Sequence, residues 1–296
     1  MPPCLRLALA AVAALVSCPA PALDASPWTA EPAPFAIERS AVHPLTSAQG
    51  RHYALYVKLP PGYERAENLL RRYPVVYLTD GPYTFQVASG VTRVPFSQEL
   101  FEEFILVGLS WAEGEAPADS RRRDLTPTIA ADKPGSGGAA DYLAFLRDVA
   151  VPWVEREYRA DPARRTLAGQ SYGGLFGLWV ALTEPTLFRN YVLSSASLWY
   201  DHRTLFALER GVAAQRRDLA ANLYFVIGSR ERPGQCGHAD CEVDMVADQA
   251  AMVRALQSRG YPHLRVQAKV VPGAYHETTF PVGLLWALQD LFTRRR

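Results

Sequence analysis

The stretch Gly169-Gln170-Ser171-Tyr172-Gly173 decides the fold, because its G-x-S-x-G pattern stands between two apolar segments. Thr166-Leu167-Ala168 precedes it, and the segment from Leu175 to Leu182 follows it. This order predicts a strand, a sharp turn and a helix, the elbow that presents a nucleophilic serine. Small residues are needed two positions before and after that serine, and both are glycine. The alternative is a glycine-rich turn with an incidental serine.

A nucleophilic serine needs an adjacent base, and the base needs a third group that fixes its tautomer. In α/β-hydrolases these residues follow the chain order serine, acid, histidine. We predict His276 as the base, since the β-branched run before it breaks at Pro272-Gly273 and leaves the imidazole on a loop. The other histidines after Ser171 are rivals for this role. His202 follows a Trp-Tyr-Asp stretch, His238 lies between two cysteines, and His263 precedes a strand.

The acid is predicted to be Glu231, which follows the apolar strand Leu223 to Ile227. The carboxyl end of a parallel strand is where ligands and catalytic groups gather. Asp240, Glu242 and Asp244 are rivals on the same long connection. Glu231 could instead be an ordinary solvated residue between two arginines, with a backbone carbonyl orienting the imidazole.

The negative oxygen of a tetrahedral intermediate requires two preorganised N–H donors. One is predicted to be the backbone N–H of Tyr172, at the positive end of the helix after the serine. The other is predicted to be Gly81, in the loop after the buried strand Val75 to Leu78, with Tyr83 as the alternative. Pro82 has no N–H. An Asp-Gly-Pro turn with no catalytic part is the alternative interpretation of this loop.

The segments alternate between strand and helix, which predicts the α/β class with a mainly parallel sheet covered on both faces. An antiparallel pair is expected first, at Ala36 to Val42 and His52 to Leu59. The further strands are expected at Val75 to Leu78, Phe104 to Leu109, Thr166 to Ala168, Tyr191 to Ser194, Leu223 to Ile227 and Leu264 to Val271.

Three other segments have recognisable patterns. Ala139 to Tyr158 carries apolar residues at helical spacing and is expected to pack ahead of the strand that leads to Ser171. Pro281 to Phe292 is expected to close the chain as a helix. Trp111 to Gly138 is the least regular part and is expected to overhang the serine as a lid or specificity loop.

The N-terminus predicts an exported protein. Residues 1–22 combine Arg6, an apolar run from Leu7 to Val16 and the small-x-small exit Ala20-Pro21-Ala22, as in a secretory signal peptide. Residues 23–34 are expected to form a disordered tether rich in Pro and Ala. We therefore expect a periplasmic or secreted protein. In a second interpretation, Leu15-Val16-Ser17-Cys18 is a lipobox and Cys18 anchors the protein to a membrane.

Composition bounds the remaining possibilities. With 296 residues and 49% hydrophobic content, the chain can bury a sizeable core, and residues 35–296 are expected to form a single catalytic domain. The formal charge of +1, without a basic stripe, argues against nucleic acid as a partner. Cys236 and Cys241 are expected to form a disulfide in an oxidising compartment. With His238 they fall short of four zinc ligands, so no metal and no cofactor is expected.

The chain resembles the putative-esterase family of α/β-hydrolases, which includes bacterial siderophore esterases of the enterobactin type. The motifs that carry the resemblance are Tyr77 to Gly81, Arg122 to Pro127, Ala168 to Phe176, Ser195 to Trp199 and Pro272 to His276. The resemblance extends from about Phe35 to the C-terminus.

The resemblance implies that Ser171 is the nucleophile and His276 the base. Gln170 stands where family members often carry histidine, and Pro82 where they carry a small residue or Asn. Arg122, Arg123 and Asp124 are expected to brace their loop rather than touch substrate.

These residues together predict an exported serine hydrolase that cleaves small carboxylic esters through an acyl-enzyme, with siderophore-type esters implied by the resemblance. An acyltransferase would use the same acyl-enzyme but pass the acyl group to an alcohol or sugar. Peptide hydrolysis ranks lower on family grounds. The alternative from a different class is a binding protein that keeps a hydrolase scaffold with an idle triad.

Overall fold

The computed structural model describes residues 34–236 and 242–294. The chain divides into two units, Met1–Ala36 and Ile37–Arg296, and only residues 34–36 of the first are among those described. The predicted signal peptide, the tether up to residue 33 and Cys18 lie outside the described residues. So do His238, Asp240 and Cys241, and with Cys241 the predicted disulfide.

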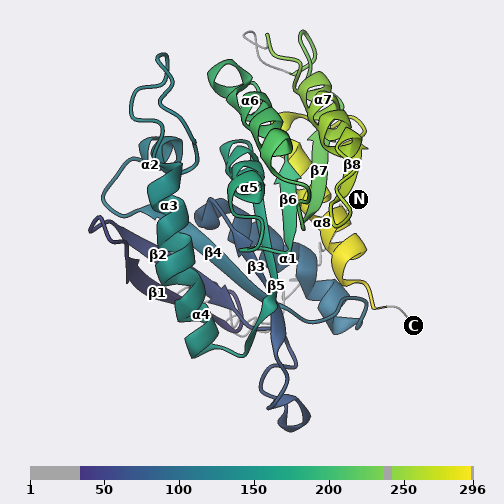
Figure 1. Cartoon of the computed structure of the whole chain (residues 1–296). Coiled ribbons are helices and arrows are strands. Elements are labelled where there is room, and N and C mark those ends of the chain that lie inside the picture. The colour runs from purple at the N-terminus through teal and green to yellow at the C-terminus, as the bar shows by residue number, and fades with distance from the viewer. Residues whose placement is uncertain (1–33, 237–241, 295–296) are drawn as a thin grey trace, which may run out of the picture. The chain divides into compact units, whose positions relative to one another are not determined.

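One eight-stranded sheet forms the centre of the second unit, in the order β1-β2-β4-β3-β5-β6-β7-β8 (Figure 1). β1 pairs antiparallel with β2, and β2 with β4, whereas all neighbours from β4 to β8 run parallel. The predicted mainly parallel α/β sheet is confirmed. The strands are β1 (Ser40–Thr46), β2 (His52–Lys58), β3 (Tyr73–Leu78), β4 (Ile105–Ala112), β5 (Ala160–Gln170), β6 (Asn190–Ser194), β7 (Asn222–Gly228) and β8 (Arg265–Val271).

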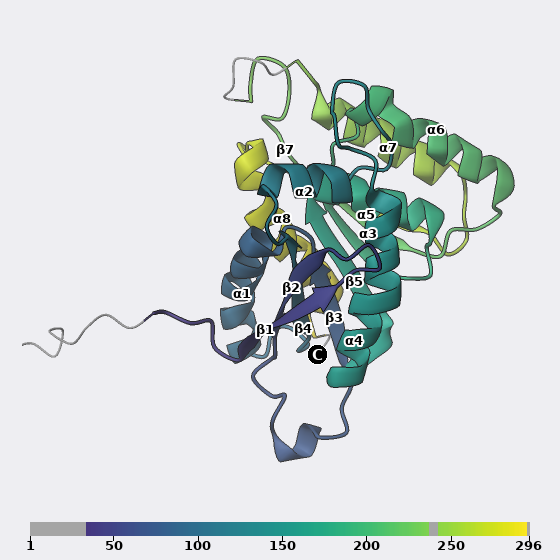
Figure 2. The same ribbon diagram turned by 90° about the vertical axis from the view of Figure 1, so that its left-hand side faces the viewer.

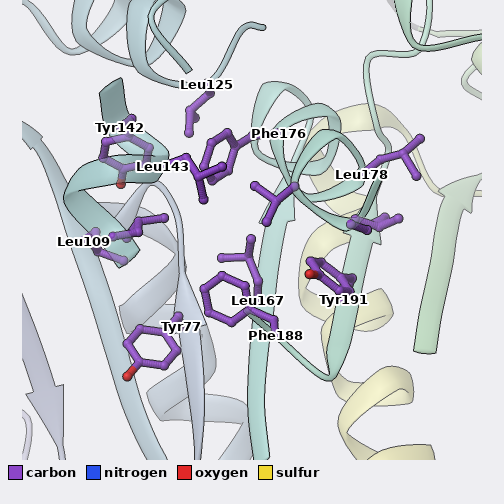
Figure 3. Close-up of a cluster of buried hydrophobic side chains, with 14 of the residues drawn as sticks. Tyr77, Leu109, Leu125, Tyr142, Leu143, Leu167, Phe176, Leu178, Phe188 and Tyr191 are labelled. Atoms are coloured by element: carbon purple, nitrogen blue, oxygen red, sulfur yellow. The ribbon is translucent and has the colours of Figure 1, made fainter. Parts of the chain in front are cut away.

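Helices cover both faces of this sheet (Figure 2). The helices are α1 (Gly81–Ser97), α2 (Pro117–Asp124), α3 (Ala139–Phe145), α4 (Val151–Glu157), α5 (Tyr172–Thr183), α6 (Tyr200–Gln215), α7 (Met245–Ser258) and α8 (His276–Phe292), with short turns η2 (Ala66–Asn68) and η3 (Leu146–Ala150). Side chains of α1 and α8 share one buried cluster. Side chains from α3 to α7 share the other, part of which Figure 3 shows.

Strand β3 is apolar along almost its whole length because both of its faces are buried. In β3, Val75 and Tyr77 belong to the cluster under α3 to α7, while Val76 and Leu78 belong to the cluster under α1 and α8. All four side chains have no solvent exposure. This packing fixes the carboxyl ends of β3 and β5, the neighbouring strands that lead to Gly81 and Ser171.

Several element boundaries differ from those expected, and three of these differences have a local physical cause. β1 begins at Ser40 and not at Ala36, because Arg39 has a left-handed backbone (φ 55°) that no strand continues through. The helix predicted for residues 139–158 is interrupted by a π-helical turn, η3, just before Pro152. Proline has no N–H to continue an α-helical ladder, which accounts for the interruption at this place.

The third difference concerns the site. α8 begins at His276, one turn earlier than the expected start at Pro281. The first N–H groups of a helix have no acceptor within the helix, so they need one from elsewhere. Here the Tyr275 N–H, just before the first turn, donates to the Thr278 hydroxyl (2.9 Å). The prediction that His276 lies on a loop is therefore wrong, since it is the first residue of a helix.

The segment Trp111 to Gly138, expected to be irregular, contains the end of β4 and the whole of α2. α2 is anchored by its buried Asp124, whose Oδ2 accepts from Tyr53 Oη of β2 (3.0 Å) and from Ser120 Oγ (3.1 Å). Among the described residues, no helix combines the length and apolar character needed to cross a membrane.

Candidate active site

Ser171 lies alone between β5, which ends at Gln170, and α5, which begins at Tyr172. Its backbone (φ 60°, ψ −116°) is outside the regions that a non-glycine residue ordinarily adopts. A Cβ on Gly169 would stand 2.5 Å from the carbonyl carbon of Gly173, and one on Gly173 would stand 2.3 Å from Thr79 Oγ1. Close packing thus requires glycine at both positions, as the spacing predicts: Gly169 lies against the backbone of Gly173, and Gly173 lies against the side chain of Thr79.

His276 and Glu231 form a hydrogen-bonded pair, with 2.8 Å between Nδ1 of the ring and Oε2 of the carboxylate. Glu231 lies in the turn directly after β7, and its N–H donates to the carbonyl of Gly228 (3.2 Å). The Glu231 side chain is 1% exposed and that of His276 is 30% exposed. A buried carboxylate therefore holds one ring nitrogen of a histidine whose other side is open to solvent.

Three further donors hold the Glu231 carboxylate. Its Oε1 accepts from Ser195 Oγ (2.6 Å), from the Gly228 N–H (2.7 Å) and from Thr279 Oγ1 (2.9 Å). Ser195 adopts a left-handed backbone with φ 45°, an unusual conformation that directs its hydroxyl to this carboxylate. Sequence reasoning missed Ser195 and Thr279 in this role, although Ser195 lies in one of the family motifs.

The rival residues are occupied elsewhere. Asp244 caps α7 by accepting from the Ala247 N–H (2.8 Å), and Glu242 is exposed. His263 pairs with Asp218 at the surface (2.6 Å), and His202 is exposed. His238 and Asp240 lie outside the described residues.

Ser171 and His276 line the same cavity, which has a volume of about 420 Å³. Its other lining residues are Asp80, Tyr83, Trp111, Arg121, Gln170 and Glu277. The Gln170 amide donates to the His276 carbonyl, which ties the end of β5 to the start of α8. Ser171 Oγ is hydrogen-bonded to Ser197 Oγ (3.2 Å), a buried hydroxyl that sequence reasoning also missed. In serine hydrolases the hydrogen bond between the nucleophile and the histidine is often long in the free enzyme and tightens only when substrate binds.

The two predicted oxyanion donors begin two helices at the same edge of the sheet. Tyr172 is the first residue of α5 and Gly81 the first of α1. An N–H at this position has no acceptor within its own helix and lies at the positive end of the helix dipole. The alternative donor Tyr83 gives its N–H to the Asp80 carbonyl (3.0 Å). A Cβ on Gly81 would stand 2.7 Å from the Leu109 carbonyl oxygen, so only glycine fits there.

A partly buried ion pair lies beside Gly81. Asp80 Oδ1 accepts from Trp111 Nε1 (2.7 Å) and from Arg121 Nε (3.0 Å), and Oδ2 accepts from a terminal nitrogen of Arg121 (3.1 Å). Burial alone would lower the pKa of Arg121, but the charge and hydrogen bonds of Asp80 outweigh it and raise that pKa. The guanidinium also lies over the Tyr172 ring, 5.3 Å from its centroid. No sequence pattern indicates this pair.

The neighbouring charges of α2 brace the segment. Arg122 bonds Asp119 (2.5 Å) and the Pro134 carbonyl (2.8 Å), and Arg123 bonds Asp124 and Glu115. These contacts agree with the expected bracing role. Within residues 34–236 and 242–294, no group of three or more His, Cys, Asp or Glu side chains is arranged to hold a metal ion.

The fold and the site together define the class, an α/β-hydrolase fold in which a strained serine and a carboxylate-bound histidine line one cavity. Residues 46–290 match the family described as "Putative esterase", and the chain belongs to this family. The resemblance stated from the motifs is therefore confirmed.

Two relatives of this chain have the names of siderophore esterases. The ferri-bacillibactin esterase BesA of Bacillus subtilis is 32% identical over 143 residues, which are 44% of this chain and 49% of BesA. The siderophore triacetylfusarinine C esterase of Aspergillus fumigatus is 30% identical over 174 residues, 57% of this chain and 60% of that protein. The chain thus spans about half or somewhat more of the length of these curated relatives.

The solved structure of the siderophore hydrolase EstB from Aspergillus nidulans is similar in fold. Its TM-score is 0.76 at 22% identity, and the match covers 88% of this chain and 98% of that chain. At this identity the likeness shows the shared fold alone.

Proposed function

We propose that this protein is a serine hydrolase that cleaves carboxylic esters through an acyl-enzyme on Ser171. The observation that carries the proposal is the 2.8 Å hydrogen bond between Glu231 and His276 at the cavity that also contains Ser171. A carboxylate on Nδ1 keeps the proton on that nitrogen and leaves Nε2 free to accept a proton. The membership of the esterase family supports the same reaction.

In this mechanism Ser171 Oγ attacks the ester carbonyl carbon while its proton passes to His276 Nε2. Glu231 stabilises the resulting imidazolium, and the N–H groups of Tyr172 and Gly81 receive the negative oxygen of the tetrahedral intermediate. Collapse of the intermediate breaks the ester bond, and His276 protonates the departing alkoxide. Water then repeats these steps on the acyl-enzyme, so the acid is released and Ser171 regains its proton.

We propose siderophore-type esters as the substrate class, because two relatives of the chain are named as siderophore esterases. The test compares hydrolysis of ferri-bacillibactin and triacetylfusarinine C with hydrolysis of p-nitrophenyl butyrate. A higher kcat/KM for either siderophore supports the substrate class. Hydrolysis of the simple ester alone would contradict this class while leaving the serine mechanism in place.

The serine mechanism is tested by Ser171→Ala. Where the catalytic groups act as a unit, loss of the nucleophile lowers kcat by about 10⁶-fold. Ser258→Ala, which changes an exposed hydroxyl at the end of α7, is the matched control and should keep full activity. Undiminished hydrolysis by Ser171→Ala, or no labelling of the wild type by a fluorophosphonate probe, would exclude the proposed nucleophile.

Export is proposed from the first 22 residues of the sequence. Expression of the full chain in a Gram-negative host should place the protein in the periplasm or the medium, trimmed at its N-terminus. A protein retained in the membrane fraction and released by Cys18→Ser would favour the lipobox interpretation. Retention of the untrimmed chain in the cytoplasm would contradict export.

A further inference from the structure

We propose that Arg121 is a positioning residue for the oxyanion site: its pairing with Asp80 cancels a buried negative charge there and fixes the peptide that carries the Gly81 N–H. The inference rests on the proposed serine mechanism. It adds a function for two side chains that line the cavity but take no step in that mechanism.

The first reason is electrostatic. Asp80 is 7% exposed and lines the same cavity as Ser171. Its carboxylate lies close to the elbow, since a Cβ on Gly173 would stand 3.6 Å from Asp80 Oδ2. A negative charge in a poorly solvated place would oppose the oxyanion that forms on the substrate, because charges interact more strongly where water is excluded. The cavity can therefore stabilise the intermediate only if Asp80 is neutralised by a cation.

Arg121 is the cation in contact with Asp80. Two of its nitrogens bind the two carboxylate oxygens at 3.0 and 3.1 Å, in the fork geometry that only arginine offers. Burial lowers the pKa of Arg121, but the charge and hydrogen bonds of Asp80, with a contribution from Tyr172, raise it overall. The neighbouring arginines are engaged elsewhere, with Asp119 and Asp124 among their partners.

The second reason is geometric. Asp80 has a left-handed backbone (φ 55°, ψ 44°), which is uncommon for a residue other than glycine. Its ψ angle sets the orientation of the next peptide, whose N–H belongs to Gly81. Because Trp111 and Arg121 together hold the Asp80 carboxylate, they also hold this conformation. The Arg121 guanidinium lies over the Tyr172 ring as well, so a single side chain contacts one oxyanion donor, Tyr172, and the residue that precedes the other, Asp80.

The experiment measures kcat and KM for p-nitrophenyl butyrate in Arg121→Met, Asp80→Asn and the double variant, with thermal unfolding for each. Arg121→Met leaves the Asp80 carboxylate without its cation, and we expect kcat to fall about 10²-fold, the loss typical of one defective oxyanion donor, with KM changed less than about threefold. The double variant should have a kcat about tenfold or more above that of Arg121→Met, because the repelling carboxylate is gone. Arg122→Met, on the same helix but bound to Asp119, is the control and should keep activity within about twofold.

Three results would overturn the inference. The double variant could be no faster than Arg121→Met, Arg121→Met could be fully active, or the loss could lie entirely in KM, as for a residue that binds substrate directly. If Arg121→Met does not fold, Arg121→Lys takes its place: it keeps the charge but not the fork, and kcat should fall about tenfold. Full activity of that variant would then refute the inference. Full activity of Ser171→Ala would instead refute the underlying mechanism.

Discussion

Glu231→Gln is the sharpest test of the histidine–carboxylate pair, because the two sides of this carboxylate face different donors. Oε1 accepts from the Gly228 N–H at 2.7 Å, a backbone donor that cannot reverse. Oε2 faces His276 Nδ1 at 2.8 Å. A glutamine must therefore place its carbonyl oxygen at the Gly228 side and its NH₂ group against the imidazole. Nδ1 then has to accept a hydrogen bond, and the ring proton moves to Nε2, where it blocks proton transfer from Ser171.

The expected magnitude follows from this change of tautomer. The opposite flip of the amide is no better, since it sets the NH₂ group against the Gly228 N–H in a buried place, at a cost of about 1–3 kcal/mol. In serine hydrolases the corresponding amide substitution lowers kcat by about 10⁴-fold. At about 1.36 kcal/mol for each tenfold change, this amounts to about 5.4 kcal/mol of lost transition-state stabilisation.

The assay is steady-state hydrolysis of p-nitrophenyl butyrate, combined with thermal unfolding. The variant has the shape of the wild type, so a loss of kcat without unfolding reports the tautomer. Glu242→Gln is the matched control, because this exposed residue lies on the same connection after β7. If kcat of Glu231→Gln stays within tenfold of the wild type, the reasoning about the ring orientation is refuted.

Two further predictions concern the framework of the site. Gly169→Ala forces a Cβ to 2.5 Å from the Gly173 backbone and should destabilise the protein by about 1–3 kcal/mol, or about 2–12 °C in Tm. Gly211→Ala on α6, with nothing within 4 Å of the added Cβ, should not lower Tm, and equal losses in both variants would contradict the packing argument. Ser195→Ala removes one donor from the Glu231 carboxylate and should cost about 1.5–3 kcal/mol in urea unfolding. An unchanged urea midpoint would show that the hydrogen bond from this hydroxyl to Glu231 does not contribute to the free energy of unfolding.

Local sequence patterns were sufficient where one segment determines its own structure. Residue spacing predicts the apolar strands and the glycines around Ser171. The chain order of serine, acid and histidine follows because each lies after the carboxyl end of a successive strand. The expected sheet and the fold class are confirmed, and the structure brings Glu231 against His276. Errors arose at boundaries set by single hydrogen bonds. The start of α8 is an example, since the Tyr275 N–H finds an acceptor in Thr278 and the helix begins before its proline.

Other parts of the site depend on contacts between segments distant in the chain. Ser195 reaches Glu231 across 36 positions, and Arg121 reaches Asp80 across 41. No spacing within Arg121-Arg122-Arg123 tells which guanidinium enters the cavity, because that choice depends on where α2 packs beside β4. Local patterns were enough to predict the sheet, the elbow and the residue types available for chemistry, since these depend on neighbours in the chain. The hydroxyl that holds the acid and the arginine that neutralises Asp80 were found only in the folded molecule, because those partners meet through the packing of separate elements.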